Sequence, residues 1–345
     1  MADWRNPGIV AALAAAALFG AATPAAKLLL GPVSPWLLAG LLYGGSGIGL
    51  FLLRRVRGAP RAKLQPGERA WLAAAIFIGG VLGPVLLLWG LVRLPASNAS
   101  LLLNAEGVLT ALIAWFVFRE NFDRRIALGM ALIVAGAVVL SVPQHLDRGS
   151  VLASLSVLLA CFCWAIDNNL TRKVALTDAS YIAMVKGLVA GAVNMTVAML
   201  LGAKIPAWPI VASSGVIGFL GYGLSLVLFV LALRALGTAR TAAYFSTAPF
   251  IGTLVAIPLL DEAVTMPLIA GGGLMAAGVL LHLTERHIHR HGHAPMEHEH
   301  AHVHDVHHQH AHPHAVDGSH VHWHRHEPLT HAHKHFPDTH HQHRH

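Results

Sequence analysis

The sequence predicts an all-α polytopic membrane protein: ten transmembrane helices arranged as two inverted five-helix repeats, followed by a disordered His-rich tail. Three observations lead to this fold class. Of the 345 residues, 55% are hydrophobic and only 12% are charged, whereas a soluble domain usually has about 25% charged residues. An apolar unit occurs twice along the chain. The positive charges give its two copies opposite orientations in the bilayer.

Ten apolar runs divide the first 284 residues. They span roughly 8–30, 34–53, 69–92, 97–118, 126–142, 150–170, 179–202, 210–234, 238–260 and 265–284. Each has about 17–25 residues, the length that crosses ~30 Å of hydrocarbon at 1.5 Å per residue. The first run is longer than the apolar core of a signal peptide, so we interpret it as a span rather than a cleaved leader. An even number of spans places both termini on one side.

The repeat is visible in two pairs of segments. Ser97–Glu120 aligns with Ala239–Glu262 at an offset of 142, and Phe19–Lys27 aligns with Trp164–Arg172 at an offset of 145. Internal duplication of an apolar unit is frequent in secondary transporters. The boundaries that follow are a first repeat at 1–142, a second repeat at 149–285 and a tail at 286–345.

The basic residues set the orientation. With the N-terminus in the cytoplasm, the cytoplasmic segments carry 14 Lys and Arg before the tail and the outer ends carry 4. This asymmetry follows the positive-inside rule. Each repeat has five spans, an odd number, so the two repeats run in opposite directions. We therefore expect cytoplasmic N- and C-termini and a transport pathway at the repeat interface.

Glu106 is the first candidate for this pathway. It lies ten residues into the fourth run and aligns with Ala248 in the second repeat. A charge at the bilayer centre costs about 2.5–3.5 kcal/mol on insertion scales. Apolar surroundings favour the neutral carboxyl, which makes Glu106 a candidate proton carrier. The alternative is a neutral Glu106 that only hydrogen-bonds between helices. Further polar candidates for the lining are Asn104, Asn168 and Asn169.

Asp167 and Lys186 form a second candidate group. Both are expected within roughly 5–11 Å of the cytoplasmic interface, on adjacent spans. They are expected to form an ion pair, either a static lock or a gate, although each could instead reach water separately. Asn194 lies two turns beyond Lys186 on nearly the same helix face and would extend the polar lining.

Prolines inside the spans are hinge candidates because each removes a helix hydrogen bond. They are Pro24, Pro84 and Pro249. The two cysteines, Cys161 and Cys163, are two residues apart on one expected helix. They point to different faces there, and we interpret them as reduced thiols packed in the helix.

The tail contains 24 of the 26 histidines, in an alternating His-x-His pattern without an apolar period. We expect disorder. Neutral imidazole suits Zn²⁺, Ni²⁺ and Cu²⁺. The candidate ligands are His298, His300, His302, His304, His307, His308, His310, His320, His322, His324 and His326. Two alternatives are a low-complexity tail without a transport role and a pH sensor. The basic excess lies in the membrane segment, not in the tail, and does not indicate nucleic-acid binding.

Four stretches carry a family resemblance: PAAK (Pro24–Lys27), NAEGVLTALIAWFVFRE (Asn104–Glu120), WAIDNNLTRK (Trp164–Lys173) and Asp261-Glu262. Over about residues 8–284 the chain resembles the drug/metabolite transporter superfamily, specifically its EamA type of ten-helix permease. The resemblance implies transport of small molecules, usually outward and often with proton exchange, across a bacterial inner membrane. The chain departs from the family at Glu106, where proline or another residue is more usual, and in its His-rich tail.

The sequence therefore predicts a secondary active transporter, not an enzyme: an exporter of a small organic metabolite or drug-like compound, working by alternating access with proton coupling. No G-x-S-x-G, H-E-x-x-H or Walker-type motif occurs. The alternative is a transition-metal (Zn, Ni or Co) transporter, or a metal-regulated permease that uses the tail. Expected partners are the lipid bilayer, the substrate, protons and divalent metals at the tail. No cofactor is required, and both a monomer and a homodimer remain open.

Overall fold

The computed structural model describes residues 7–59, 67–118, 124–141, 148–171, 174, 178–236, 241, 244–283, 288–293, 296–302, 320–326 and 329–334. Its contacts divide the chain into a helical unit, residues 1–285, and a tail unit, residues 286–345.

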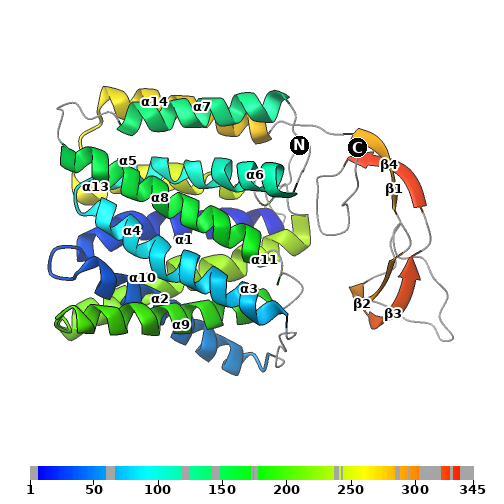
Figure 1. Cartoon of the computed structure of the whole chain (residues 1–345), viewed down its shortest axis with the longest axis horizontal. Coiled ribbons are helices and arrows are strands. Elements are labelled where there is room, and N and C mark those ends of the chain that lie inside the picture. Colours follow the sequence, from blue (N-terminus) through cyan, green and yellow to red (C-terminus); the bar gives the residue numbers. More distant parts are fainter. Residues whose placement is uncertain are drawn as a thin grey trace. The chain divides into compact units, whose positions relative to one another are not determined.

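The helical unit contains the following elements (Figure 1). The first half has α1 (Pro7–Leu29), α2 (Pro35–Val56), α3 (Glu68–Ala75), the π-helix η1 (Ile76–Leu82), α4 (Gly83–Leu91), α5 (Ala96–Leu102), α6 (Asn104–Phe118) and α7 (Arg124–Ser141). The second half has α8 (Arg148–Thr171), α9 (Ala179–Leu200), α10 (Trp208–Gly218), the π-helix η3 (Phe219–Leu224), α11 (Ser225–Leu236), α13 (Ala248–Leu260) and α14 (Met266–Leu283).

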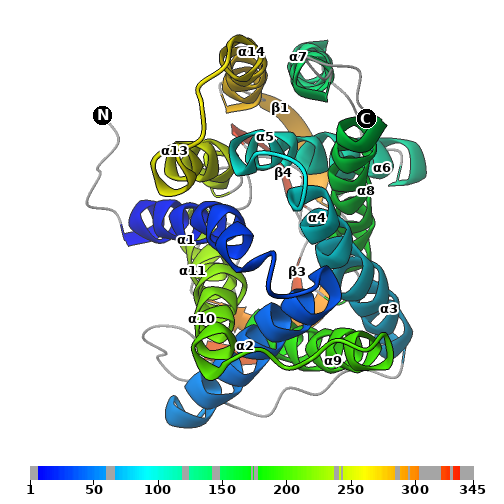
Figure 2. The same cartoon turned by 90° about the vertical axis from the view of Figure 1, so that its left-hand side faces the viewer.

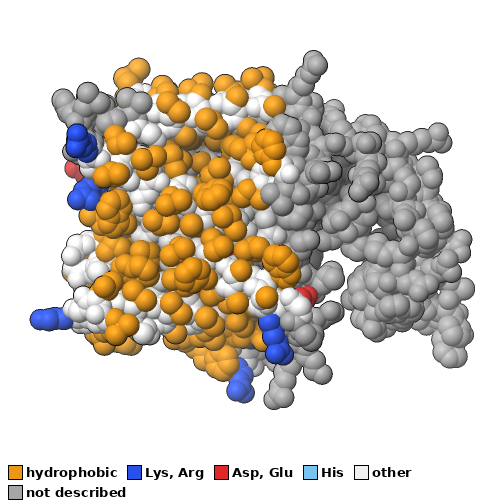
Figure 3. Space-filling view, in the orientation of Figure 1, with side chains coloured by type: hydrophobic (Ala, Val, Ile, Leu, Met, Phe, Trp, Pro, Cys, Tyr) orange, Lys and Arg blue, Asp and Glu red, His pale blue; other side chains and the backbone are white. Residues whose placement is uncertain are grey.

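The described helices are long and apolar enough for a polytopic membrane protein. Seven segments meet the length and hydropathy that a membrane crossing needs: Pro7–Leu29, Pro35–Val56, Glu68–Leu91, Ala96–Ile113, Arg148–Thr171, Ser180–Leu200 and Trp208–Ala232. Three shorter apolar helices cover Ala127–Ser141, Ala248–Leu260 and Met266–Leu281. Hydrophobic side chains cover most of the described surface in Figure 3, and Lys and Arg lie toward its edges. Such a surface matches a hydrocarbon solvent, in which backbone polar groups must be paired within helices.

The first helix of each half packs into the other half. α1 contacts α10, η3, α11 and α13 of the second half, whereas α8 contacts α3, η1, α4 and α6 of the first half. Figure 2 shows both placements, with α1 beside α13 and α11, and α8 beside α4 and α6. This reciprocal exchange brings polar residues of α8 against helices of the first repeat.

α2 and α9 make the most extensive interhelical contact. Their backbones approach closely: a Cβ atom on Gly187 would lie 2.6 Å from Gly47 N, and one on Gly191 would lie 2.5 Å from Gly44 N. Small residues allow such an approach between membrane helices. α7 and α14 form a second close pair, at the edge of the helical unit opposite α2 and α9 (Figures 1 and 2).

The two halves share local geometry at the end of this glycine-rich pair. α2 is followed by Gly58 at φ 59° and α9 by Gly202 at φ 80°. Ala59 N donates to Arg54 O and Ala203 N donates to Ala198 O, both at 3.0 Å or less. These bonds are the six-to-one contact of a Schellman motif, whose left-handed position favours glycine. Two helices 144 residues apart therefore end in the same way.

Two expected spans contain irregular helix. The third run includes η1 and the eighth includes η3, and both occupy related positions in the two halves. The fourth run, expected as one segment, is interrupted at Leu103 between α5 and α6. In the second half, a turn at Ser246–Thr247 precedes α13 at the related place. Short π-helical segments occur frequently at functional sites.

The tail unit differs from the disorder expected from its sequence. It contains β1 (Ile288–His293), β2 (Met296–His302), β3 (His320–His326) and β4 (Leu329–Lys334). β1 pairs with β4 and β2 pairs with β3, both antiparallel. The alternating His-x-His pattern has the two-residue period of a strand, which lets these segments pair without an apolar core. His304, His307, His308 and His310 lie outside the described residues.

Candidate functional site

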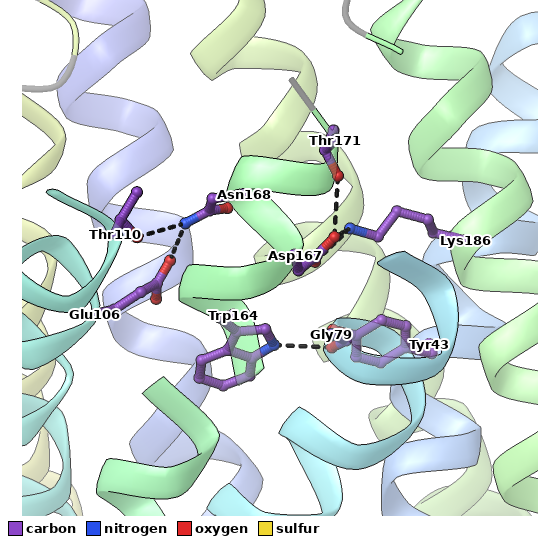
Figure 4. Close-up of polar contacts among 9 residues, drawn as sticks. All are labelled: Tyr43, Gly79, Glu106, Thr110, Trp164, Asp167, Asn168, Thr171 and Lys186. Atoms are coloured by element: carbon purple, nitrogen blue, oxygen red, sulfur yellow. Dashed lines mark hydrogen bonds and ion pairs between the residues drawn. The ribbon is translucent and has the colours of Figure 1, made fainter. Parts of the chain in front are cut away.

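Glu106 lies at the break in the fourth span. α5 ends at Leu102, α6 begins at Asn104, and Glu106 is in the first turn of α6 (Figure 4). The amide of Asn104 donates to Leu101 O at 3.0 Å, so a carbonyl freed by the break is paired. The N-terminal turn of a helix carries partial positive charge, which suits a carboxylate. The break therefore gives an acidic side chain a favourable position within an apolar segment.

Asn168 of α8 binds Glu106. Its Nδ2 donates to Glu106 Oε1 at 2.8 Å and to Thr110 Oγ1 at 3.3 Å. Glu106 is half-buried, whereas Asn168 is exposed. The neighbouring Asn169 donates to the carbonyls of Thr110, at 3.3 Å, and Ala165, at 2.8 Å. Two consecutive amides of the second repeat thus hold one face of α6 in the first repeat.

Asp167 and Lys186 form the ion pair expected from the sequence. Lys186 Nζ of α9 lies 2.7 Å from Asp167 Oδ1 and 2.5 Å from Oδ2. Thr171 Oγ1 donates to Asp167 Oδ1 at 2.9 Å. The side chain of Asp167 is 7% exposed and that of Lys186 is 18% exposed. Figure 4 shows that Asp167 and Asn168, adjacent on α8, point to opposite sides: one toward Lys186 and the other toward Glu106.

The π-helix η1 packs directly against this ion pair. A Cβ atom on Gly79 would overlap the carboxylate of Asp167. The carbonyl of Gly79 accepts bonds from Trp164 Nε1 at 2.9 Å and from Tyr43 OH at 3.3 Å (Figure 4). The amide of Asn194 donates to Gly80 O at 3.2 Å. Side chains from three other helices therefore bind two consecutive carbonyls of η1.

In the second half, the equivalent contact between the π-helix and the first helix of the other half is apolar. Gly221 of η3 corresponds to Gly79 at the repeat offset of 142, and Ala22 of α1 corresponds to Asp167 at the offset of 145. A Cβ atom on Gly221 would overlap the Cβ atom of Ala22. Both crossings place a glycine against the first helix of the other half. Only the crossing at Gly79 faces a carboxylate.

Two of the predicted pathway residues lie apart from the Glu106 contact. Asn104 is buried, and its amide also lies 3.8 Å from Met275 Sδ of α14. Asn194 is fully buried and faces η1 rather than Glu106. The amide of Asn104 therefore pairs the carbonyl left free at the helix break. The amide of Asn194 links α9 to η1.

The hinge candidates occupy three different settings. Pro24 is inside α1. Pro84 lies in the first turn of α4, directly after η1, and Pro249 lies in the first turn of α13, directly after the Ser246–Thr247 turn. A proline in the first turn after a non-helical turn removes no intrahelical hydrogen bond, which is the case for Pro249. Pro84 follows η1 without a break, so its missing N–H leaves a carbonyl of η1 without a helical donor. Pro84 and Pro249 thus begin helices at irregular points of their spans.

The sequence did not single out Tyr43, Gly79, Thr110 or Thr171. The residues adjacent to Tyr43 and Thr171 do not indicate the contacts that these two side chains make. The alignment of Gly79 with Gly221 between the two repeats is the sequence signal that could have identified Gly79.

Polar contacts also fix the ends of the helices. The carboxylate of Glu262 accepts from Ala96 N at 2.6 Å and Ser97 N at 2.9 Å, which caps α5. Lys27 donates to Leu94 O. At the start of α9, Asp178 forms an ion pair with Arg54 of α2 at 3.0 Å. Glu120, which aligns with Glu262 in the repeat, lies outside the described residues.

Asp178 caps α9, and its pKa departs from the ordinary value. Its Oδ1 accepts from Ser180 N at 2.8 Å and from Tyr181 N at 3.2 Å. Partial burial raises the pKa of Asp178, but hydrogen bonds from Ser180, Arg54 and Tyr181 and the charge of Arg54 outweigh it. The pKa of Asp178 is therefore lowered from 3.8.

A known protein family matches most of the chain. The model of the EamA-like transporter family matches twice, at residues 6–142 and 151–284. The chain belongs to the EamA-like transporter family. The sequence resemblance is thereby confirmed, and the protein is a membrane transporter of the drug/metabolite transporter type.

Relatives of this EamA-like protein are also transporters. An uncharacterized transporter of Methanothermobacter thermautotrophicus is 27% identical over 293 residues, covering 79% of this chain and 85% of its own. A probable amino-acid metabolite efflux pump of Salmonella typhimurium is 26% identical over 217 residues, covering 57% and 70%. One solved crystal structure has a TM-score of 0.62 at 18% identity, covering 81% of this chain and 99% of that one, which supports the fold alone.

Proposed function

We propose that this EamA-like protein is a secondary active exporter of a small organic metabolite or drug-like compound, working by proton-coupled alternating access. The observation that carries the proposal is the Glu106–Asn168 contact, in which an intramembrane carboxyl binds the first helix of the other repeat. Intramembrane carboxyls usually face a bundle interior or a water-filled cavity and mark ion pathways. The name of the Salmonella relative supports outward transport of an amino-acid metabolite or a similar compound.

The proposed architecture has ten spans in two inverted repeats, with both termini in the cytoplasm of a bacterial inner membrane. The seven long apolar segments and three shorter ones support ten crossings. The twofold family match supports the repeat. The excess of basic residues at alternate ends supports the inversion.

In the proposed mechanism, Glu106 alternates between a charged and a protonated state. The ionised carboxylate accepts a charge-assisted hydrogen bond from Asn168, which is about twice as strong as a neutral one. Protonation weakens this bond and loosens α6 from α8. Asn168 is exposed, and an exposed polar side chain is costly in hydrocarbon, so we place a water-accessible route at this contact. Substrate binding and proton release would then compete at Glu106.

We assign the Asp167–Lys186 pair the role of a static lock. Both residues belong to the second repeat, and Gly79 of the first repeat packs onto their carboxylate side. Removing one partner of a buried pair leaves an uncompensated charge. A pair enclosed in this way holds α8 to α9 while the Glu106 contact changes.

The proposal concerns an organic substrate rather than a metal ion. Within the described residues, no group of three or more His, Cys, Asp or Glu side chains lies together in a way that would hold a metal. Cys161 is buried and its thiol donates to Leu102 O at 3.6 Å. The proposal of an organic substrate is supported by the names of the relatives.

Flux through proteoliposomes tests the role of Glu106. An untargeted metabolite comparison of deletion and overexpression strains first identifies a substrate. The variant Glu106→Gln keeps the size and the acceptor oxygen but cannot exchange a proton. We expect it to lose proton-driven flux, measured with a pH-sensitive dye inside the vesicles. Glu262→Gln is the matched control, since Glu262 also binds at a helix start but caps α5, and it should retain coupling. Undiminished proton-coupled flux in Glu106→Gln would remove Glu106 from the mechanism.

A further inference from the structure

The helices α13 and α14 follow each other in the chain but pack against different neighbours. α13 packs against α1 and α5, whereas α14 packs chiefly against α7. Figure 2 shows the same arrangement, with α14 beside α7 and α13 beside α1. A groove of about 290 Å³ lies between α13 and α14, and we call it the α13–α14 groove. Its lining includes Leu101 of α5, Thr253, Leu254 and Ile257 of α13, and Leu268 and Gly272 of α14.

The lining of this groove is apolar. Leu101 is only 2% exposed and closes the floor, whereas Leu254 at the rim is 69% exposed. Thr253 has the one polar side chain among the lining residues, and its hydroxyl already donates to the carbonyls of Ser97, at 3.1 Å, and Pro249, at 3.0 Å. The groove therefore offers an occupant dispersion contacts rather than hydrogen bonds.

The length of the groove matches one leaflet of a bilayer. From Phe250, which also lines the groove, to the end of the helix at Leu260, α13 rises about 15 Å at 1.5 Å per residue. This rise is half of the ~30 Å hydrocarbon core. An unfilled groove would lose its contacts on one side. A hydrocarbon chain that enters from one leaflet has the length and the chemistry to fill it.

An acidic side chain lies at the end of this groove. Asp261 follows α13 directly, in the left-handed conformation with φ 51°, and it is exposed. In the chain it lies between Ile257 and Val264, both of which line the groove. The neighbouring Glu262 instead binds the start of α5. The carboxylate of Asp261 is therefore placed where the headgroup of a lipid in the groove would lie.

We propose that the α13–α14 groove binds an acyl chain of a phospholipid whose headgroup carries a primary ammonium group, as in phosphatidylethanolamine, and that Asp261 binds this ammonium. A primary ammonium has three N–H donors and forms charge-assisted hydrogen bonds with a carboxylate. The quaternary nitrogen of phosphatidylcholine has no N–H, and the anionic headgroup of phosphatidylglycerol is repelled by a carboxylate. The proposal does not depend on the proposed transport mechanism.

Two adjacent glycines of α14 test the occupant of the groove. A Cβ atom on Gly272 would lie 3.2 Å from Leu101, whereas one on Gly273 meets nothing within 4 Å. Gly272→Leu should therefore fill the groove, and Gly273→Leu is a control of identical composition. The full chain is delipidated in detergent and titrated with phosphatidylethanolamine, phosphatidylcholine or phosphatidylglycerol of equal chain length, and native mass spectrometry measures the bound lipid.

Gly272→Leu should bind phosphatidylethanolamine and phosphatidylcholine at least about tenfold more weakly than Gly273→Leu, because the burial of about two methylene groups already amounts to tenfold. Equal binding by the two variants would show that the acyl chain does not occupy the groove.

Asp261→Asn tests the headgroup separately and leaves the groove unchanged. Asparagine adopts the left-handed conformation readily, so only the charge is lost. We expect this variant to bind phosphatidylethanolamine about tenfold more weakly, since a hydrogen bond to a charged group is worth about that factor. Its binding of phosphatidylcholine should not change. An unchanged protein that binds these two lipids equally, or that prefers phosphatidylglycerol, would overturn the proposal, and so would an Asp261→Asn variant that keeps its preference for phosphatidylethanolamine.

Discussion

Gly79 has the most restricted setting of the residues around the candidate site. Its carbonyl binds Trp164 and Tyr43, and the space beyond its Cα is filled by the carboxylate of Asp167. A side chain at this position must displace either the carboxylate or η1. The repeat-related Gly221 meets only Ala22. The steric requirement is shared by both halves, while the ion pair belongs to one.

Gly79→Ala should therefore destabilise the protein, by about 1–3 kcal/mol as for other overpacked positions. Gly44→Ala is the matched control, because a Cβ atom there meets open space. An alanine in a helix interior is usually more favourable than glycine by about 0.5–1 kcal/mol. Thermal unfolding in detergent should show a lower Tm for Gly79→Ala and an unchanged or higher Tm for Gly44→Ala. An equal effect of both changes would contradict the close contact with Asp167.

The Asp167–Lys186 pair gives a second prediction for single residues. Lys186→Met leaves a buried carboxylate without its partner, which costs about 3–5 kcal/mol in comparable pairs. Adding Asp167→Asn removes the unpaired charge, so the double variant should be more stable than Lys186→Met alone. Thermal unfolding of the two single variants and the double variant measures this coupling. A double variant that loses the sum of both single effects would show that the residues do not interact.

The start of α9 depends on one side chain with two functions. Asp178 caps the helix through Ser180 N and Tyr181 N and pairs with Arg54 of α2. Asparagine is as good an N-cap as aspartate, whereas alanine is worse by about 1 kcal/mol. Asp178→Asn should thus lose only the ion pair, and Asp178→Ala should lose both contacts. We expect Asp178→Ala to unfold at the lower temperature of the two.

The same element predicts a dependence on pH. The pKa of Asp178 is lowered in the folded protein, so its contribution to stability is present above 3.8 and is lost as the pH falls through the lowered value. Unfolding followed from pH 6 down to pH 3 should show a smaller acid-induced loss in Asp178→Asn than in the unchanged protein. Identical pH profiles would indicate that the cap and the Arg54 pair do not hold the charged form.

At the scale of the helical unit, the reciprocal exchange of α1 and α8 determines where the site lies. Asn168 and Asp167 belong to the second repeat, yet they contact Glu106 and Gly79 of the first. The candidate site is therefore built between repeats. In the proposed inverted arrangement, the related helix ends after α2 and α9 lie on opposite sides of the membrane.

Thiol labelling in cells tests this inversion. Ala59→Cys and Ala203→Cys occupy the same position of the two Schellman motifs, in a background where Cys161 and Cys163 are serine. A membrane-impermeant maleimide should label Ala203→Cys in spheroplasts and Ala59→Cys only after permeabilisation. Labelling of both from the same side would rule out the inverted repeat.

The sequence by itself determined the polytopic helical class, the family and the internal repeat. These properties depend on local composition, on run length and on residue order, all of which are present in the chain before it folds. It also placed Asp167 and Lys186 close enough in depth to pair, because the rise per residue converts position along a span into distance from the interface.

Only the tertiary structure decided which polar groups meet. The apolar period does not reveal the break at Leu103, beside which Asn104 binds the Leu101 carbonyl, and this break places Glu106 at a helix start. The exchange of α8 into the first half brought Asn168 to Glu106 across 62 residues of sequence. In the tail, alternation alone was compatible with disorder, whereas the register of β2 and β3 pairs His300 with His322 along the backbone. Such pairings depend on the packing of segments far apart in the chain, and spacing within one segment does not encode them.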